Sequence, residues 1–157
     1  MHIAELNIAR LKHPMDDPRT ADFANNLDLI NELAERTPGF VWRLKDEAGN
    51  ATSFRISDDP LMIANLSVWE SAEALEHFVF NTLHRRFYAR REEWFEVMQE
   101  GYFVMWRIER GEMPTLEEAM ARLAKLRAEG ASEEAFDWEH LIGPERLKAQ
   151  RCAARAA

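Results

Sequence analysis

The sequence contains a single cysteine, Cys152, among its 157 residues. One cysteine cannot form an internal disulfide, and it cannot supply the several thiolates of a cysteine-ligated metal site. Positive charge is also scarce, because 20 Lys and Arg residues stand against 28 Asp and Glu residues and give a formal net charge of −8. Nucleic acids and anionic membrane surfaces are bound through clustered positive charge, so we expect neither as a partner.

Several sequence signals of function are missing as well. No uncharged apolar run is long enough to cross a bilayer, and MHIAELNIARLKHP lacks the basic start and apolar block of a signal peptide. GxGxxG, P-loop, GxSxG and HExxH patterns are all absent, so no nucleotide cofactor, serine hydrolase or zinc site is expected. The length of 157 residues fits one domain, and the hydrophobic share of 46% is that of a globular protein. The absences together predict a cytoplasmic protein.

The pattern of apolar residues predicts an α+β fold. Strand-like segments lie at residues 2–11, 40–47, 62–69 and 102–109. Helical segments are predicted over residues 19–36, from Ser71 onward with a candidate break at Asn81-Thr82, and from a capping box at Thr115 to Gly130. The first six elements have the ferredoxin-like order βαββαβ, an antiparallel sheet with helices on one face.

The segments at the end of the chain are predicted to add to this core. Residues 1–142 are assigned to one domain, in which residues 135–142 form a short fifth strand. Residues 143–157 form a basic, helix-prone tail that frays. Large apolar side chains occur on both faces of residues 102–109, and a second sheet from another copy of the chain would cover the outer face. We therefore expect a homodimer.

The run SVWESAEALEHF, together with the order of elements, resembles the dimeric α/β-barrel superfamily that includes antibiotic-biosynthesis monooxygenases. Trp69, Glu73 and His77 match a pattern common in that superfamily. The longer run PGFVWRL … SVWES … LHRRFYARREEWF … PTLEEAMARL resembles a mostly uncharacterised bacterial domain family within it, from Ile3 to about Trp138. The resemblance implies a dimeric α/β barrel but no single activity, because the superfamily includes oxygenases, heme-dependent enzymes and isomerases.

Asn65 and Trp69 add a more specific likeness. Some cofactor-independent monooxygenases of the superfamily use an asparagine and a tryptophan with this spacing on the third strand, with an arginine further on. The resemblance therefore implies that this pair lines a pocket, while Arg85, Arg86, Arg90 and Arg91 all stay open as the arginine. The alternative is that Asn65 is a buried structural amide satisfied by a nearby loop.

His77 and His84 are seven residues apart and would share one side of a continuous helix with Tyr88 and Arg91. Either histidine is a candidate proton acceptor or, if the protein binds heme, an axial ligand. The alternative is a half-buried histidine at the edge of an apolar stripe. The aromatic side chains Trp42 and Trp106 are predicted to line the pocket with Tyr88 and Arg91, although tryptophans more often fill cores.

These residues predict a small-molecule-binding protein that acts, if it is an enzyme, as a cofactor-independent monooxygenase or isomerase on an aromatic or polyketide-like substrate. Asn65 and Trp69 would position the substrate, and His84 or His77 would be the base. A non-catalytic binding or stress-associated protein and a heme-binding protein are the alternatives. No metal and no cofactor other than heme is expected.

Overall fold

The computed structural model describes residues 1–46, 49 and 55–156. It is an α+β structure in which four antiparallel strands form one sheet in the order β2-β3-β1-β4. The strands are β1 (His2–Arg10), β2 (Phe40–Arg43), β3 (Met62–Trp69) and β4 (Phe103–Ile108). The described helices are η1 (Pro18–Thr20), α1 (Ala21–Arg36), α2 (Ala72–Asn81), α3 (His84–Ala89), α4 (Arg91–Trp94), α5 (Leu116–Glu129), α6 (Trp138–Ile142) and α7 (Pro144–Ala156).

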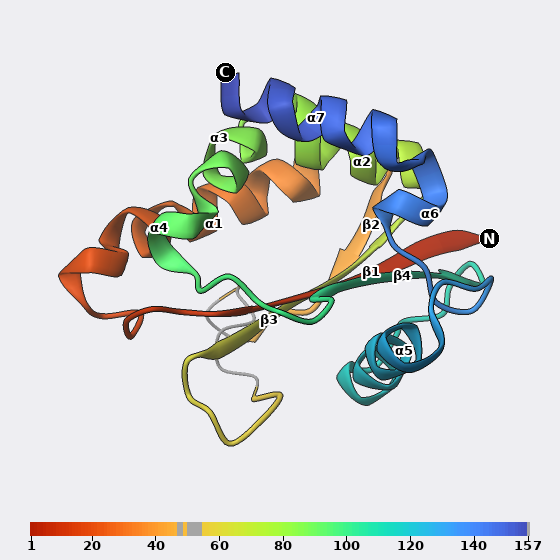
Figure 1. Cartoon of the computed structure of the whole chain (residues 1–157), viewed down its shortest axis with the longest axis horizontal. Helices are drawn as coiled ribbons and strands as arrows, with labels where there is room; N and C mark the ends of the chain where they lie inside the picture. Colours follow the sequence, from red (N-terminus) through yellow and green to blue (C-terminus); the bar gives the residue numbers. More distant parts are fainter. Residues whose placement is uncertain (47–48, 50–54, 157) are drawn as a thin grey trace.

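The two faces of the sheet are covered by different helices (Figure 1). All helices except α5 lie on one side, which we call the near face, and α5 lies on the other, the far face. On the far face, Ala119 and Leu123 of α5 join a buried cluster with Leu6, Val104 and Trp106 of the sheet. The two helices expected on one face of the sheet correspond to α1 and α2, and both lie on the near face. No face was predicted for the later helix, α5.

This position of α5 also changes the argument for a dimer. The outer face of β4 is covered by α5, and its inner face packs near Phe136 and Trp138, which join the near-face core. Both apolar faces of β4 are thus buried within one chain, so they no longer require a second sheet. The homodimer stays a prediction, without the premise from which it was inferred.

The end of the chain is more ordered than its sequence indicates. Phe136 forms an isolated bridge with Met105, and α6 follows at once, so the predicted fifth strand is wrong. α7 packs on α2, α3 and α6 and buries Leu147 and Ala154. Fraying at the very end of the tail stays a prediction. Among the helices of the described segments, none combines the length and the apolar character needed to span a bilayer.

Local signals explain where the helices near the site begin and end. Ser71 caps α2 by accepting a hydrogen bond from the backbone N–H of Ala74, as predicted. At the other end of α2, Thr82 is extended and its hydroxyl donates to the Phe78 carbonyl at 2.6 Å. The chain then restarts as a new helix, α3, at His84. The predicted break at Asn81-Thr82 is confirmed, and it resets the direction in which the following side chains point.

Candidate functional site

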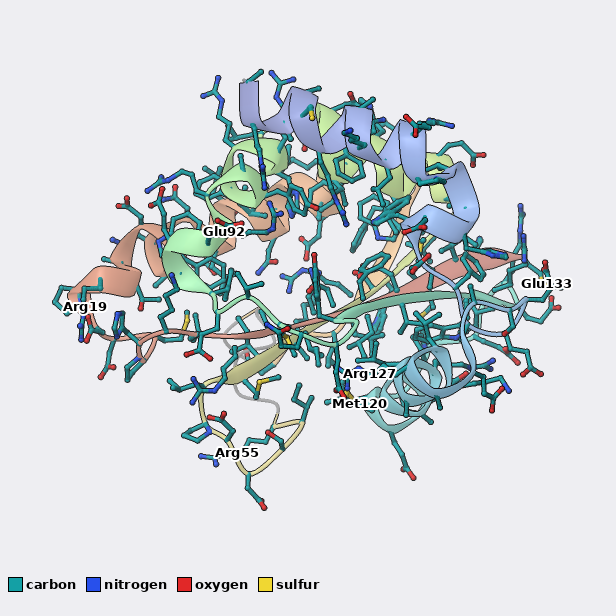
Figure 2. All side chains as sticks on the ribbon, viewed as in Figure 1. Arg19, Arg55, Glu92, Met120, Arg127 and Glu133 are labelled. Carbon is teal, nitrogen blue, oxygen red and sulfur yellow. The ribbon has the colours of Figure 1, made fainter. Side chains whose placement is uncertain are left out.

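A cavity of about 300 Å³ lies between the near face of the sheet and the helices above it. Its size is at the lower end of the range of small-molecule sites. Figure 2 shows side chains from both layers in this region, with Glu92 on α4. Nine aromatic side chains line it: Phe23, Phe40, Trp69, Phe78, Phe87, Tyr88, Trp94, Phe95 and Tyr102.

The floor of the cavity is polar. Asn65 on β3 and Asn7 on β1 are directly paired across the sheet, and both side chains are exposed and line the cavity. The amide of Asn65 donates from Nδ2 to Glu5 Oε1 over 3.3 Å, a long hydrogen bond. Its carbonyl oxygen has no hydrogen bond to any described residue. The interpretation of Asn65 as a buried structural amide is therefore wrong, because its side chain faces open space.

Beside these amides lies a hydrogen-bonded chain that sequence reasoning missed. Trp69 Nε1 donates to Ser67 Oγ over 2.9 Å, and Ser67 Oγ donates to Glu5 Oε1 over 2.5 Å. Ser67 and Trp69 line the cavity, whereas Glu5 lies behind them with 3% of its surface exposed. The chain of bonds connects the cavity to a buried carboxyl group.

The carboxyl group of Glu5 has an unusual acidity. Burial raises its pKa to about 8, and the hydrogen bond from Ser67 opposes this rise. No described cation forms an ion pair with it. Arg43 lies two strands away in the same row of the sheet, beyond Ser67, and pairs with Glu35 at 2.9 Å. At neutral pH Glu5 is therefore mostly protonated, and it can exchange a proton under physiological conditions.

His84 occupies the first position of α3 and lines the cavity. Its Nδ1 lies 3.1 Å from the Val79 carbonyl, and its ring centroid is 4.7 Å from that of Phe78. Because a carbonyl only accepts, Nδ1 carries the hydrogen and Nε2 keeps a lone pair. Burial lowers the pKa of His84, and the bond to Val79 opposes this. The imidazole is therefore neutral at pH 7, the form that can accept a proton.

One of the four candidate arginines lines the cavity. The Arg91 guanidinium lies 4.3 Å from the centroid of the Tyr88 ring, and Nη1 donates to the Tyr88 carbonyl over 2.8 Å. Arg90 instead pairs with Asp22 and Glu93, and neither it nor the two remaining arginines, Arg85 and Arg86, lines the cavity. The structure thus singles out Arg91 by position.

Of the eight predicted site residues, the cavity brings together Asn65, Trp69, His84, Tyr88 and Arg91. His77 is exposed on α2 outside the cavity, because the break after Asn81 removes the helical phase that would have aligned it with His84.

The two remaining predicted residues, Trp42 and Trp106, lie on the far face, in the core with α5. A β-bulge between Phe40 and Trp42 shifts the alternation of β2, so that Phe40 and Arg43 line the cavity instead of Trp42. Trp106 pairs with Ala4, whose side chain also belongs to the far face.

Metal ligands do not cluster anywhere in the described segments: no group of three or more His, Cys, Asp or Glu side chains there is arranged to hold an ion. The residues that sequence reasoning missed are Glu5, Ser67 and Asn7. The available signal was the alternation of β1, which places Glu5 and Asn7 on the same side as the apolar Ile3.

Comparison with known proteins supplies a family but no activity. The family model described as "Domain of unknown function (DUF3291)" matches residues 2–152. No curated protein matches the chain at a significant level. Among solved structures, a structural-genomics protein called YjcS matches with 13% identity and a TM-score of 0.47, over 69% of this chain and 100% of that chain. A likeness this distant carries no argument about chemistry.

Proposed function

The chain belongs to the DUF3291 family, and we propose that its cavity binds a small aromatic or polyketide-like molecule and moves a proton on it. The observation that carries the proposal is an aromatic-walled cavity whose floor bears the Asn65 amide and whose wall bears a neutral histidine, His84. Aromatic walls favour a flat ring, and a small number of polar groups fixes its orientation.

The chemistry follows from these groups. His84 Nε2 accepts a proton from a carbon beside a carbonyl or from a phenol, and the negative charge moves to the substrate oxygen. The Asn65 amide exchanges its long bond to Glu5 for a bond to that oxygen. Glu5 returns a proton when the Ser67 hydroxyl, which donates to Glu5 in the resting protein, turns to donate to the substrate and accepts the proton of Glu5 in its place. Release of the proton on His84 to water and uptake of one by Glu5 then restore both groups. Reprotonation at another carbon gives an isomerase, whereas reaction of the carbanion with O₂ gives a monooxygenase.

Binding is tested first. Quenching of tryptophan fluorescence with a panel of phenols, naphthols and quinones reports occupancy, because Trp69 and Trp94 line the cavity. We expect binding that weakens in Asn65→Ala. If no member of the panel binds and Asn65→Ala changes nothing, the proposal is wrong.

Catalysis is tested by proton exchange. A fused aromatic ketone is incubated with the protein in D₂O, and deuterium uptake beside the carbonyl is followed by NMR. We expect His84→Gln to abolish the enzymatic uptake and His77→Gln to leave it unchanged, because only His84 lines the cavity. Binding without any exchange would favour the alternative, a binding protein without catalysis. A Soret band that is lost in His84→Gln would favour heme, since His84 Nε2 is the nitrogen free to hold iron.

We further infer that the sheet and the helices α1 and α2 form a ferredoxin-like βαββαβ core, to which α5, α6 and α7 are added. The strand order β2-β3-β1-β4 supports this. Assembly into a homodimeric barrel is a separate proposal, which rests on the resemblance to dimeric α/β-barrel proteins. Light scattering on the purified chain tests it, and a monomer at micromolar concentration would contradict it.

A further inference from the structure

The charges around the cavity are unequally compensated. Three of the charged side chains that line it have an opposite charge nearby: Arg43 pairs with Glu35 at 2.9 Å, Glu96 with Arg10 at 2.9 Å, and Glu92 with Arg155 at 3.9 Å. Arg91 lines the same cavity and is half-buried, yet it forms no ion pair with any described residue.

Two phenol groups lie beside this uncompensated cation. Tyr88 lies under the Arg91 guanidinium, and Tyr102 contacts the same side chain; both tyrosines line the cavity. The Tyr88 hydroxyl accepts a hydrogen bond from Arg151 Nε on α7 over 3.2 Å, and Arg151 also has no carboxylate partner among the described residues. Because the Tyr88 oxygen accepts this bond, its own hydrogen stays available to a further acceptor.

These side chains come from separate parts of the chain. Tyr88 lies on α3, Arg91 begins α4, Tyr102 precedes β4, and Arg151 lies on α7. They are held in place, since Arg91 also donates to the Tyr88 carbonyl and the Tyr102 backbone carbonyl accepts from the Ile8 N–H. The site is also next to the candidate base, because the rings of His84 and Tyr88 are stacked with centroids 6.4 Å apart.

We propose that Arg91, Tyr88 and Tyr102 bind an anionic oxygen group of the ligand, a carboxylate or an ionised phenol, with Arg151 supporting Tyr88 from α7. The inference rests on the proposed function and narrows its substrate class to aromatic acids or acidic phenols. A guanidinium and two hydroxyl donors match the acceptor geometry of such a group, and the surrounding aromatic walls accept the ring. Glu92 and Glu96, which also line the cavity, are neutralised in part by their own arginines.

The test compares two ligands of nearly the same size by calorimetry: naphthoate, which is charged, and naphthamide of the same substitution, which is neutral. We expect the wild-type protein to prefer naphthoate by about tenfold or more, the size of a charge-assisted hydrogen bond. Arg91→Gln should remove this preference and leave naphthamide binding within about twofold. Arg86→Gln is the matched control, because Arg86 is exposed on α3 and does not line the cavity.

Two further variants keep the result interpretable. Arg91→Lys retains the charge without the planar fork and should keep part of the preference, and Tyr102→Phe should reduce it without changing the net charge. An ionised nitronaphthol replaces naphthoate in a parallel titration and tells a phenolate site from a carboxylate site.

Equal binding of naphthoate and naphthamide by the wild-type protein would overturn the anion site and leave the cavity proposal standing. The same holds if Arg91→Gln weakens both ligands to the same extent. Failure of both ligands to bind the wild-type protein would instead count against the proposed function, and the anion site would be lost with it.

Discussion

Replacing Glu5 with glutamine is expected to shift stability in favour of the variant as the pH rises toward neutral. Glu5 is 3% exposed, and its carboxyl accepts hydrogen bonds from Ser67 and Asn65. Glutamine has nearly the same shape, and its amide oxygen can accept the same two bonds. The variant therefore keeps the accepting oxygen and removes the ionisable group. Its NH2 group adds buried donors, which shift its stability by an amount that does not depend on pH.

The sign of the effect follows from the pKa of Glu5, which burial raises from 4.5 to about 8. A carboxyl that holds its proton more tightly in the folded chain favours folding below the unfolded pKa, and this contribution is lost as the pH rises through the folded pKa. At about 1.4 kcal/mol per pH unit, the loss between pH 4.5 and pH 8 is about 5 kcal/mol, of which about 3 kcal/mol is lost by pH 7. Glutamine has no such dependence.

Urea unfolding at several pH values between 5 and 8 measures the effect. The difference in unfolding free energy between Glu5→Gln and wild type should shift in favour of the variant by about 2–3 kcal/mol between pH 5 and pH 7. Other titrating groups, including His84, cancel in this difference because both proteins contain them. Glu109→Gln, at an exposed carboxylate, should give a small and flat difference. A difference for Glu5→Gln that does not change between pH 5 and pH 8 would refute the reasoning.

Two further predictions concern the supports of the site. Gly39→Ala should cost about 2 kcal/mol or more in unfolding free energy, because Gly39 has φ +89° and a new Cβ would lie 2.5 Å from that of Ala74. Gly111→Ala, with the same φ but open space around it, should cost less, and an equal loss in Tm would contradict the clash. Arg146→Ala should cost about 1–2 kcal/mol, because it removes the ion-pair partner of the buried Glu76 carboxylate at 2.7 Å and leaves it only the hydrogen bond from Gln150. The control Arg36→Ala, at an exposed pair, should change urea unfolding by less than about 0.5 kcal/mol, and equal losses would show that α7 does not depend on the buried pair.

The parts of the fold that follow from local chemistry were predictable. The third strand was predicted over residues 62–69 and is observed over the same range. Six of its eight residues are apolar, the exceptions being Asn65 and Ser67, and the capping serine of the next helix, Ser71, follows soon after. Thr115 and Gly130 likewise bound α5 as predicted. β2 ends at Arg43, earlier than the predicted residue 47, which lies outside the described residues.

The errors arise where one local event changes the side on which many residues fall. The bulge in β2 moves Trp42 to the far face, although the period-two pattern of its sequence is unbroken. The stripe of α5, including Leu123, shows that one side of that helix is buried, but amphipathic spacing is the same for either face of a sheet. A short segment of sequence determines neither the bulge in β2 nor the face that α5 covers. The prediction that Trp42 and Trp106 line the pocket was therefore wrong.

The break between α2 and α3 shows how such an event also decides chemistry. On a continuous helix His77 and His84 would be equivalent candidates, and periodicity alone could not separate them. The extended backbone at Thr82 leaves His77 exposed and places His84 against Phe78 inside the cavity. The break itself could be predicted from the sequence. The direction of α3 after the break could not, because it depends on how α3 packs on the rest of the protein.

The placement of Glu5 is the strongest physical reason to assign work to this cavity. A glutamine would satisfy the same hydrogen bonds without the loss of about 3 kcal/mol at pH 7 that the buried carboxyl imposes. A buried ionisable residue that destabilises the fold, and that a neutral residue of the same shape could replace, is expected mainly where function requires it. Its only described side-chain hydrogen bonds lead, through Ser67 and Asn65, to the cavity floor. The cost to stability therefore falls where a proton that titrates near neutral pH can reach a molecule bound in the cavity.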